Sequence, residues 1–513
     1  MADLLDNTFS RRQFIKGVAL TSAGLSLGPH FVFGKAQPST PMKRQMGRLG
    51  FEATTLGLGG QASLEWTPAG EDPVKIILKA FDLGINYYDT SNVYDGSQAN
   101  YGKAFRELHL VPDQPGYNAR LRSSVFLTSK TALRFGKGGW QKPGLINVSN
   151  GMDFSKGTAG PGSHTVDDLK RTLSQVFGDG KGNYPQGAYL NQVLMHSVSS
   201  LADVDALYEG YDHPDPKAET IGTLATLIDY RDGSNLTGLN PKEEKLVRHI
   251  GFSGHLSPAV MMEMIQRDHR GILEGMLVAI NANDRQNFSM QYNVIPVAAA
   301  NNMGVIAMKV FADGAMYTKK AEFTRSAEQV VPTVGSSTLP SRRLIQYTLS
   351  TPGVHTAIIG TGHIDADPAA CQLQQNLAAA QIAPNALSVS GRREIEKLAG
   401  TVKDGKTNYF QAPAQPLGAA REAWARQEMQ GSQRVAQLQW QGAYAGDEPI
   451  VRYEIWRDRQ KAGQVVHKPQ INKTPFTFQD AVSDEVAHSY QIVTVDAVGR
   501  SAKTEDMLIP SIC

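Results

Sequence analysis

Residues 85–94 read INYYDTSNVY, and this stretch decides the fold. A short apolar and aromatic run ends in Asp89, and Tyr94 follows shortly after it. A run of this kind is typical of a strand that is buried on both faces of a parallel sheet. Polar residues after such a strand lie at its carboxyl end, which is the active-site face of an α/β barrel. The stretch therefore predicts a parallel strand that brings a carboxylate and a phenol to a site.

Two further runs end in chemically active residues. The run SVFLTSK ends in Lys130, and the run NQVLMHS contains His196. In one barrel, residues at the carboxyl ends of several strands meet in space. Asp89 would hold Lys130, whose ammonium would lower the pKa of the Tyr94 phenol, and His196 would hydrogen-bond a carbonyl oxygen. The four residues together predict a proton-donating site.

Each of these residues also has a purely structural interpretation. A tyrosine can pack with a satisfied hydroxyl, a lone lysine is usually a solvated tail, and a histidine can bond to backbone in a core. The order of all four, each at a strand end, favours the catalytic interpretation. The other histidines, including His109, His164 and His255, show no spacing typical of metal ligands, so no metal site is predicted.

Apolar runs alternate with amphipathic stretches such as PVKIILKAFDLG eight times along the chain. The runs begin at Thr54, Ile85, Ser124, Asn191, His249, Leu277, Gly304 and His355. Eight β/α units are the number that closes a (β/α)8 TIM barrel. A doubly wound sheet is the alternative, but it needs a glycine-rich fingerprint after the first strand and an acidic residue about 20 residues further on. The segment LGLGG does not have that form, so the sequence favours the α/β class with a TIM barrel.

On these motifs the chain resembles the aldo-keto reductases, a family of (β/α)8 barrels that reduce carbonyls with NAD(P)H. The segment DTSNVY is followed by GSQANYGKAF, and TSK ends at Lys130 and LMH at His196. The resemblance covers roughly residues 44–400. It implies an NAD(P)-dependent oxidoreductase that interconverts a carbonyl, either an aldehyde or a ketone, and an alcohol. Tyr94 would be its proton donor, with Asp89, Lys130 and His196 as the other catalytic residues.

The resemblance also implies contacts to the cofactor NAD(P)(H). Ser253 stands where the family holds the nicotinamide amide, although Gly254 replaces an asparagine there, and Asn281 stands in place of the family's strand-six glutamine. The stretch KVFADG is similar to the segment that passes the pyrophosphate. The full implied set is Gly60, Gln61, Ser253, Asn281, Phe311, Thr361, Gly362, Gln375 and Asn376.

The nucleotide preference depends on the residues between GTG and QQNL. Family members that prefer NADP place an arginine there. This chain has Asp365 and Asp367 and neither arginine nor lysine. Two carboxylates would repel a 2′-phosphate, which favours NAD.

The N-terminal segment has the form of an export signal. Residues 10–16, SRRQFIK, match a twin-arginine core, and a weakly hydrophobic run ends in GKA at Ala36. Residues 1–36 are therefore predicted to be a twin-arginine signal peptide, with the export machinery as a partner and the periplasm as the destination. A chance arginine pair ahead of a core helix is the alternative. Pro29 and His30 interrupt the apolar run, which disfavours a membrane-spanning helix.

Length and composition set the remaining limits. A chain of 513 residues suggests two or three domains, and 41% hydrophobic residues are enough to fill a large core. The net charge of +2 equals that of residues 1–36 alone, so no nucleic-acid partner is expected. The only two cysteines, Cys371 and Cys513, form neither a disulfide framework nor a metal motif.

The hydrophobic period changes after residue 400. Residues 401–429 are polar and rich in Ala and Gln, which predicts a linker and two parts that fold separately. Residues 430–513 contain alternating runs such as VRYEIWRD, separated by turn residues, which predicts a small all-β sandwich. These strands resemble a fibronectin type III module through Trp440, Tyr453 and Tyr490. Alternation points these rings into a core; an exposed sugar-binding face is the alternative.

Two functional hypotheses follow. The first is a periplasmic oxidoreductase that acts on a small-molecule carbonyl or alcohol. The second is a non-catalytic sensor or scaffold of the cell envelope, whose barrel holds a cofactor while the sandwich binds a protein or glycan partner. The complete set of Asp89, Tyr94, Lys130 and His196 favours the first hypothesis.

Overall fold

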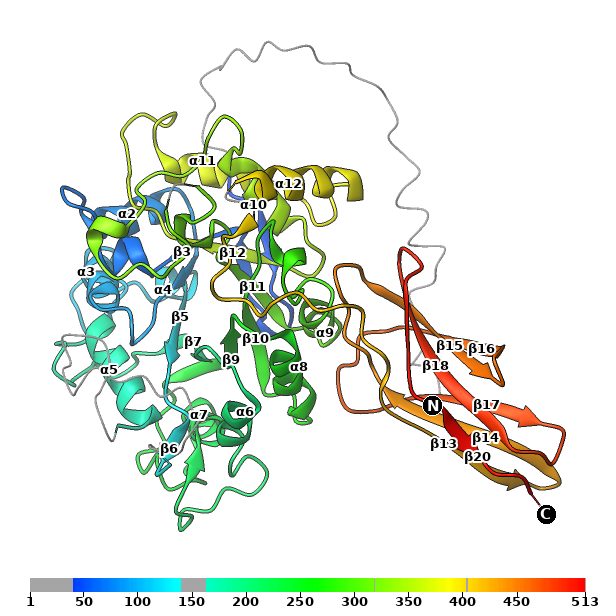
Figure 1. Ribbon diagram of the computed structural model, residues 1–513. Coiled ribbons are helices and arrows are strands. Elements are labelled where there is room, and N and C mark those ends of the chain that lie inside the picture. The colour runs from blue at the N-terminus through cyan, green and yellow to red at the C-terminus, as the bar shows by residue number, and fades with distance from the viewer. Residues whose placement is uncertain (1–39, 140–162, 318, 403–404, 513) are drawn as a thin grey trace, which may run out of the picture. The chain divides into compact units, whose positions relative to one another are not determined.

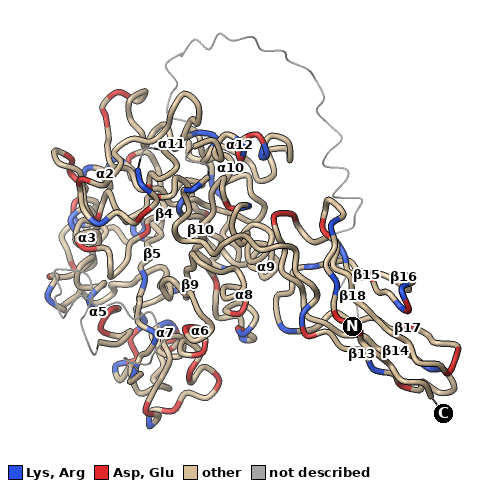
Figure 2. Tube along the Cα trace, in the orientation of Figure 1, with Lys and Arg blue, Asp and Glu red and all other residues tan. Residues whose placement is uncertain are grey.

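The computed structural model describes residues 40–139, 163–317, 319–402 and 405–512. The predicted signal peptide, residues 1–36, lies outside them. None of the helices in these ranges has both the length and the apolar content that a membrane span needs. Basic and acidic residues are interspersed along the trace, as Figure 2 shows.

Eight parallel strands close into a barrel, with helices around them (Figure 1). The last strand pairs with the first through Ala357 and Leu56, so the ring has no open edge. The predicted TIM barrel is confirmed, and the doubly wound sheet is wrong because such a sheet stays open. The strands in ring order are β3 (Leu56–Gly59), β4 (Tyr87–Asp89), β5 (Phe126–Thr131), β7 (Leu190–Met195), β9 (Val247–Gly254), β10 (Leu273–Ala279), β11 (Gly304–Met308) and β12 (Thr356–Ile359).

The helices follow the strands and bury their apolar faces against them. Helix α2 begins where Asp72 accepts a hydrogen bond from the Val74 N–H and Pro73 takes the first helical position. The described helices are α2 (Pro73–Asp82), α3 (Ser97–Glu107), α4 (Ala119–Ser123), α5 (Thr165–Phe177), α6 (Leu201–Leu207), α7 (Thr223–Asp232), α8 (Pro258–Arg267), α9 (Val294–Ala300), α10 (Ser341–Leu349), α11 (Gln372–Ala379) and α12 (Val389–Thr401). Short elements complete the barrel: β1 (Lys43–Gln45) with β2 (Glu52–Thr54), β6 (Phe135–Lys137) with β8 (Ile221–Gly222), and 3-10 turns at Gly47–Leu49, Ala62–Leu64, Asp284–Gln286, Ala312–Gly314 and Ala327–Gln329.

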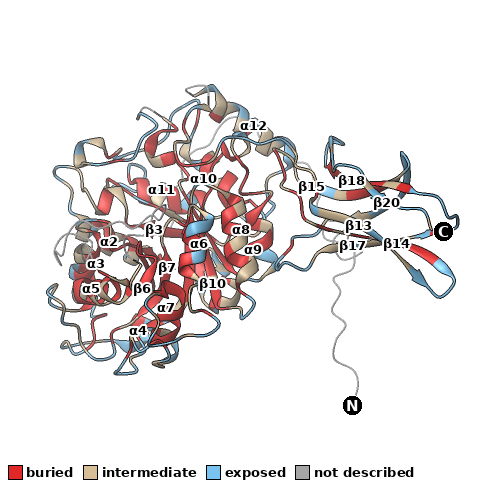
Figure 3. Ribbon diagram, turned by 60° about the horizontal axis from the view of Figure 1, so that its bottom comes forward, coloured by how far each residue is buried: buried red, intermediate tan, exposed pale blue. Residues whose placement is uncertain are grey.

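The C-terminal region consists of two antiparallel sheets that share one core. Trp440, Tyr453 and Tyr490 are fully buried, so the prediction that they pack inside is confirmed. Figure 3 shows buried, half-buried and exposed residues mixed along these strands, whereas most residues of the barrel strands are buried. One sheet contains β13 (Arg421–Gln430), β14 (Gln433–Gln441) and β17 (Phe476–Val482); the other contains β16 (Gln460–Val466), β15 (Ile450–Arg457), β18 (His488–Asp496), β19 (Ser501–Lys503) and β20 (Met507–Ile509).

The segment expected to be a linker is structured in two places. Strand β13 begins at Arg421, inside the range 401–429. Before it, Thr407, Phe410 and Gln411 are buried, and the Gln411 side chain donates a hydrogen bond to the Ala279 carbonyl at the end of β10. Residues 405–412, which we call the strap, are therefore part of the packed end of the barrel.

Candidate active site

The structure brings the four predicted catalytic residues together. The Lys130 ammonium lies 2.6 Å from Asp89 Oδ1 and donates to the Thr90 carbonyl at 2.8 Å. The same nitrogen lies 4.6 Å from the centroid of the Tyr94 ring. The His196 ring meets the Tyr94 ring edge to face, with centroids 5.8 Å apart. The residues come from β4, β5 and the loops after β4 and β7, so the parallel strands position them.

The ion pair at the centre of this site is deeply buried. Asp89 is 1% exposed and Lys130 is 2% exposed. Burial raises the pKa of Asp89 and lowers the pKa of Lys130, and the attraction between the two charges opposes both shifts. Asp89 Oδ2 is buried without a hydrogen-bond partner among the described residues. Because buried ion pairs of this kind add little net stability, stability alone does not explain why the pair lies at the barrel mouth.

Tyr94 differs from the prediction in one respect. Burial, followed by the carboxylates of Asp89 and Glu65, raises its pKa well above the ordinary value. The predicted lowering by Lys130 is wrong, because the ammonium lies at the ring and bonds Asp89 and Thr90. The Tyr94 hydroxyl makes no hydrogen bond to a described residue, and it keeps its proton at neutral pH.

His196 is held as a neutral imidazole. Its Nδ1 lies 3.4 Å from the Ser91 hydroxyl. Burial lowers its pKa well below the ordinary value, and the nearby cations of Lys130 and Arg134 lower it further. Arg134 donates to the His196 carbonyl at 2.9 Å and pairs with Asp203 at 2.7 Å, which fixes the backbone of this loop.

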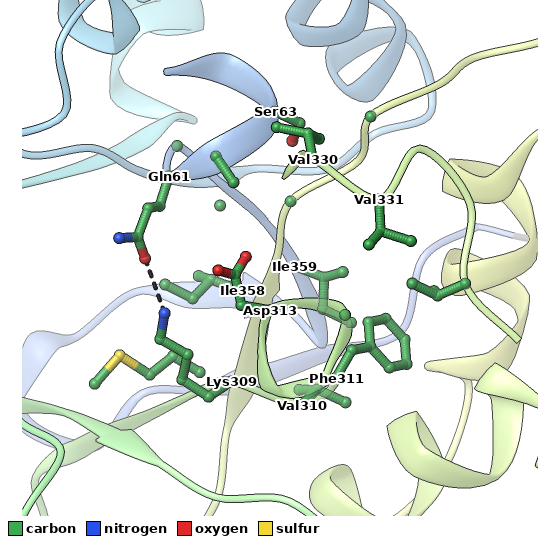
Figure 4. Close-up of a pocket in the computed structure, with 18 of the residues that line it drawn as sticks. Gln61, Ser63, Lys309, Val310, Phe311, Asp313, Val330, Val331, Ile358 and Ile359 are labelled. Carbon is green, nitrogen blue, oxygen red and sulfur yellow. Dashed lines mark hydrogen bonds between the residues drawn. The ribbon is translucent and has the colours of Figure 1, made fainter. Parts of the chain in front are cut away.

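Tyr94 and Asp89 are among the residues that line a cleft, and Figure 4 shows other residues of its wall. Four residues of the predicted cofactor set line it, namely Gly60, Gln61, Phe311 and Gly362. Gly60 has no room for a side chain, because an added Cβ would lie 2.2 Å from the Asp89 carbonyl oxygen. Across the cleft, the Lys309 ammonium donates to the Gln61 side-chain oxygen at 3.0 Å, the bond drawn in Figure 4.

The other predicted cofactor residues are not part of the cleft lining. Ser253 accepts a hydrogen bond from the Ser197 N–H at 2.9 Å. The Asn281 amide donates to the Lys309 carbonyl and to Asn408 of the strap, so the protein itself occupies both of its N–H groups.

The remaining three predicted residues follow β12. Thr361 Oγ1 and Asn376 Nδ2 are buried and lack partners among the described residues, which leaves them able to bond a ligand. Gln375 is exposed, and its amide donates to the Ala369 carbonyl.

Several residues of the barrel mouth were not predicted from the sequence. The Lys309 ammonium lines the cleft, and burial raises the pKa of Glu65 to about 8. His255 and Phe410 contact each other beside His196, with ring centroids 6.4 Å apart. Two adjacent aromatic residues in an otherwise polar segment, Tyr409 and Phe410, were the sequence feature that could have predicted that the strap is packed. Within the described ranges, no group of histidine, cysteine and acidic residues has the arrangement of a metal site.

Comparison with known proteins gives one match at the level of sequence families. Residues 55–149 match the model of the aldo/keto reductase family. The matched segment contains Asp89, Tyr94 and Lys130 and ends before His196. No curated protein matches the chain.

Three solved structures illustrate distant similarities to this chain. A proposed aldo-keto reductase from Pseudomonas aeruginosa is 20% identical, covering 66% of this chain and 95% of its own, with a TM-score of 0.39. A D-psicose 3-epimerase is 8% identical over 69% of this chain and 100% of its own, with a TM-score of 0.27. A β-glucuronidase from Parabacteroides merdae is 11% identical over 92% of this chain and 50% of its own, also with a TM-score of 0.27. At these scores the similarities say nothing about the activity of this chain.

Proposed function

We propose that this chain is an oxidoreductase of the aldo-keto reductase type, which interconverts an aldehyde or ketone and an alcohol with NAD(P)(H). The observation that carries the proposal is the buried Lys130–Asp89 pair beside the Tyr94 ring, at the carboxyl end of a closed barrel. The family match over residues 55–149 supports it. The alternative of a non-catalytic sensor gives no reason to bury this pair at the barrel mouth.

The cleft fits a dinucleotide. Gly60 lets a ligand approach the backbone closely, and the buried Ser63 hydroxyl in the cleft wall has no partner among the described residues. Thr361 and Asn376 offer further unpaired polar atoms. Phe311 contributes an apolar surface. When bound, the nicotinamide would supply or accept a hydride.

Tyr94 supplies the proton in this proposal. A carbonyl that gains a hydride at carbon needs a proton at oxygen, and a phenol in hydrogen-bond contact can give it. Its raised pKa keeps that proton in place until the alkoxide forms. Lys130 then stabilises the tyrosinate by its charge, and Asp89 holds the ammonium in position. In the direction of alcohol oxidation, Tyr94 takes the proton back.

His196 orients the carbonyl. A neutral imidazole has one N–H to donate, and its low pKa prevents it from becoming a competing cation. Because the His196 and Tyr94 rings are neighbours, both can reach one carbonyl oxygen.

Tyr94→Phe tests the proposal. It should lower the rate of carbonyl-dependent oxidation of reduced nicotinamide by about 10²–10⁴-fold. Binding of the dinucleotide, measured by fluorescence, should be nearly unchanged. Tyr184→Phe is the matched control and should keep full activity. Tyr184 precedes β7 in the chain, and its hydroxyl donates a hydrogen bond to Glu244. A loss of less than tenfold in Tyr94→Phe would show that this hydroxyl is not the acid.

We further propose that the enzyme prefers NAD. Asp365 and Asp367 lie between Gly362 and helix α11, where a 2′-phosphate would need a cation. His363, the nearest basic side chain in sequence, already pairs with Glu71 at 2.6 Å. The ratio of kcat/KM for NADH to that for NADPH should exceed one. Replacing both aspartates by serine should lower that ratio.

The predicted export also remains a proposal. Residues 1–36 are proposed to direct the folded enzyme to the periplasm by the twin-arginine route, with a protein or glycan bound by the C-terminal sandwich. Replacing Arg11 and Arg12 by lysine should leave the protein in the cytoplasm, because the pathway recognises the paired arginines. Fractionation that finds this variant in the periplasm would contradict the export proposal.

A further inference from the structure

Two histidines stand side by side at the mouth of the barrel. His196 follows β7 and His255 follows β9, and these strands are neighbours in the ring. The centroids of the two imidazole rings lie 6.5 Å apart. In each ring, Nδ1 lies 3.4 Å from a serine hydroxyl, which belongs to Ser91 for His196 and to Ser197 for His255.

The hydrogen bonds of His255 leave one ring nitrogen available. Ser197 Oγ has no other partner among the described residues, so its O–H can donate to Nδ1 of His255. The remaining proton of the neutral ring then sits on Nε2, which becomes a donor. Nε2 makes no hydrogen bond to a described residue, and the side chain is only partly buried.

A purely structural role leaves this arrangement unexplained. No carboxylate of the described residues lies within ion-pair distance of His255. Burial, followed by the charges of Lys309 and Lys130, lowers its pKa to about 3, so the ring is neutral. The ring also packs edge to face against Phe410 of the strap, which is 2% exposed. The contact with Phe410 fixes the plane of the imidazole, and Ser197 fixes its tautomer.

We propose that His255 is a substrate-binding residue, and that the substrate carries a second oxygen on the carbon next to its carbonyl. This inference rests on the proposed function. N–H···O bonds are about 2.9 Å long, so donors on two rings 6.5 Å apart can reach oxygens on neighbouring carbons. His196 takes the carbonyl oxygen, and His255 takes a hydroxyl or second carbonyl beside it.

A donor placed for a substrate oxygen should discriminate between two aldehydes of the same size. 2-Hydroxypropanal and 2-methylpropanal differ only in a hydroxyl that replaces a methyl on that carbon. The wild-type full chain should prefer the hydroxy compound by about tenfold or more in kcat/KM, because the methyl leaves the His255 N–H without an acceptor.

Variants at position 255 separate recognition from structure. His255→Phe should remove the preference for 2-hydroxypropanal while changing kcat/KM for 2-methylpropanal by less than about threefold. His255→Gln, which keeps an N–H donor, should restore part of the preference. His269→Phe is the matched control, because His269 lies in the exposed loop between α8 and β10, and it should leave both rates unchanged.

The outcomes distinguish this inference from the proposed function. Turnover of both aldehydes without a preference, or an equal loss on both in His255→Phe, would overturn the role of His255 and leave the oxidoreductase proposal intact. Failure of the wild-type chain to reduce either aldehyde, or any other carbonyl, with both nicotinamide cofactors would overturn both.

Discussion

Strand β5 of the barrel and strand β17 of the sandwich each carry a charged residue in an ion pair, but in different surroundings. Every residue of β5 is buried, so Lys130 interrupts a fully buried run. Residues of β17 alternate between exposed and half-buried positions up to the buried Val482, and Asp480 is half-buried on the same side of the strand as Phe476 and Phe478. Asp480 bonds the Tyr490 hydroxyl at 2.8 Å and Arg457 at 2.9 Å, both within the sandwich.

The difference shows where sequence patterns reveal function. A parallel strand covered on both faces excludes charge, so a lysine that remains there needs a special reason. The half-buried side of β17 still contacts water, so an acid such as Asp480 can be kept there by a local ion pair alone. Charged residues therefore point to a site in the barrel but not in the sandwich.

Removing each acid is the strongest test of this comparison. Asp89→Leu should cost about 3–5 kcal/mol in the free energy of unfolding, because it leaves Lys130 buried and unpaired. Asp480→Leu should cost about 1–2 kcal/mol, since it removes one half-exposed ion pair and one hydrogen bond. Urea unfolding of both variants measures the difference. Equal losses would show that the burial of Lys130 has no special energetic weight.

The double variant Asp89→Leu with Lys130→Met sharpens the same test. It removes both charges and keeps an apolar side chain of similar length, so stability should recover most of the loss. Activity should not recover, because the charge near Tyr94 is gone. A double variant no more stable than Asp89→Leu alone would indicate lost packing rather than an uncompensated charge.

The sequence was sufficient for the barrel and for the four central residues because both depend on local pattern. Eight buried runs give eight strands, and residues at their ends share one face. The direction of the Tyr94 pKa was not predictable in this way, because it depends on where the Lys130 ammonium lies relative to the ring. Phe410 was missed for a similar reason: it is buried by long-range contacts of a polar segment, and periodicity does not report those.

Acid should destabilise the barrel mouth through its neutral histidines. His255 has a folded-state pKa of about 3, below the ordinary value of 6.5. Below pH 6.5 the unfolded chain therefore binds a proton at this residue, whereas the folded chain does not. The free energy of unfolding falls as pH falls from about 6.5 towards 3. At pH 5 this one residue accounts for about 2 kcal/mol.

Comparing wild type with a histidine variant at two pH values separates the contribution of His255 to stability from that of other histidines. His467 in the sandwich, with a pKa lowered to about 4 by burial, shifts stability in the same direction. The difference in unfolding free energy between wild type and His255→Gln should therefore change by about 2 kcal/mol between pH 7 and pH 5. His467→Gln should show its own change of the same sign. A His255→Gln difference that is independent of pH would mean that the folded chain protonates this ring as readily as the unfolded chain does.

Contacts across the predicted linker bear on whether the two regions unfold separately. Arg285 and Arg393 on the barrel side alternate with Glu396 and Glu448 in a ring of four ion pairs, with N···O distances of 2.5–3.0 Å. Asn293 exchanges two hydrogen bonds with the backbone of Ala445. The polar composition of the linker predicted that the two regions fold separately, whereas these bonds predict that they unfold together.

Two isoleucine-to-valine substitutions, one in each region, distinguish separate unfolding from joint unfolding. Ile306 in β11 and Ile455 in β15 are both fully buried, and each isoleucine-to-valine change should cost about 0.5–1.5 kcal/mol. If the ring of ion pairs couples the regions, calorimetry should show one transition that either substitution shifts to lower temperature. Glu448→Gln, which weakens the ring, should then split or broaden that transition. Two transitions in the wild type, each moved by only one of the valine variants, would contradict the coupling. In either case Ile455→Val should leave kcat unchanged at temperatures below the transition, because the sandwich core shares no residue with the candidate active site.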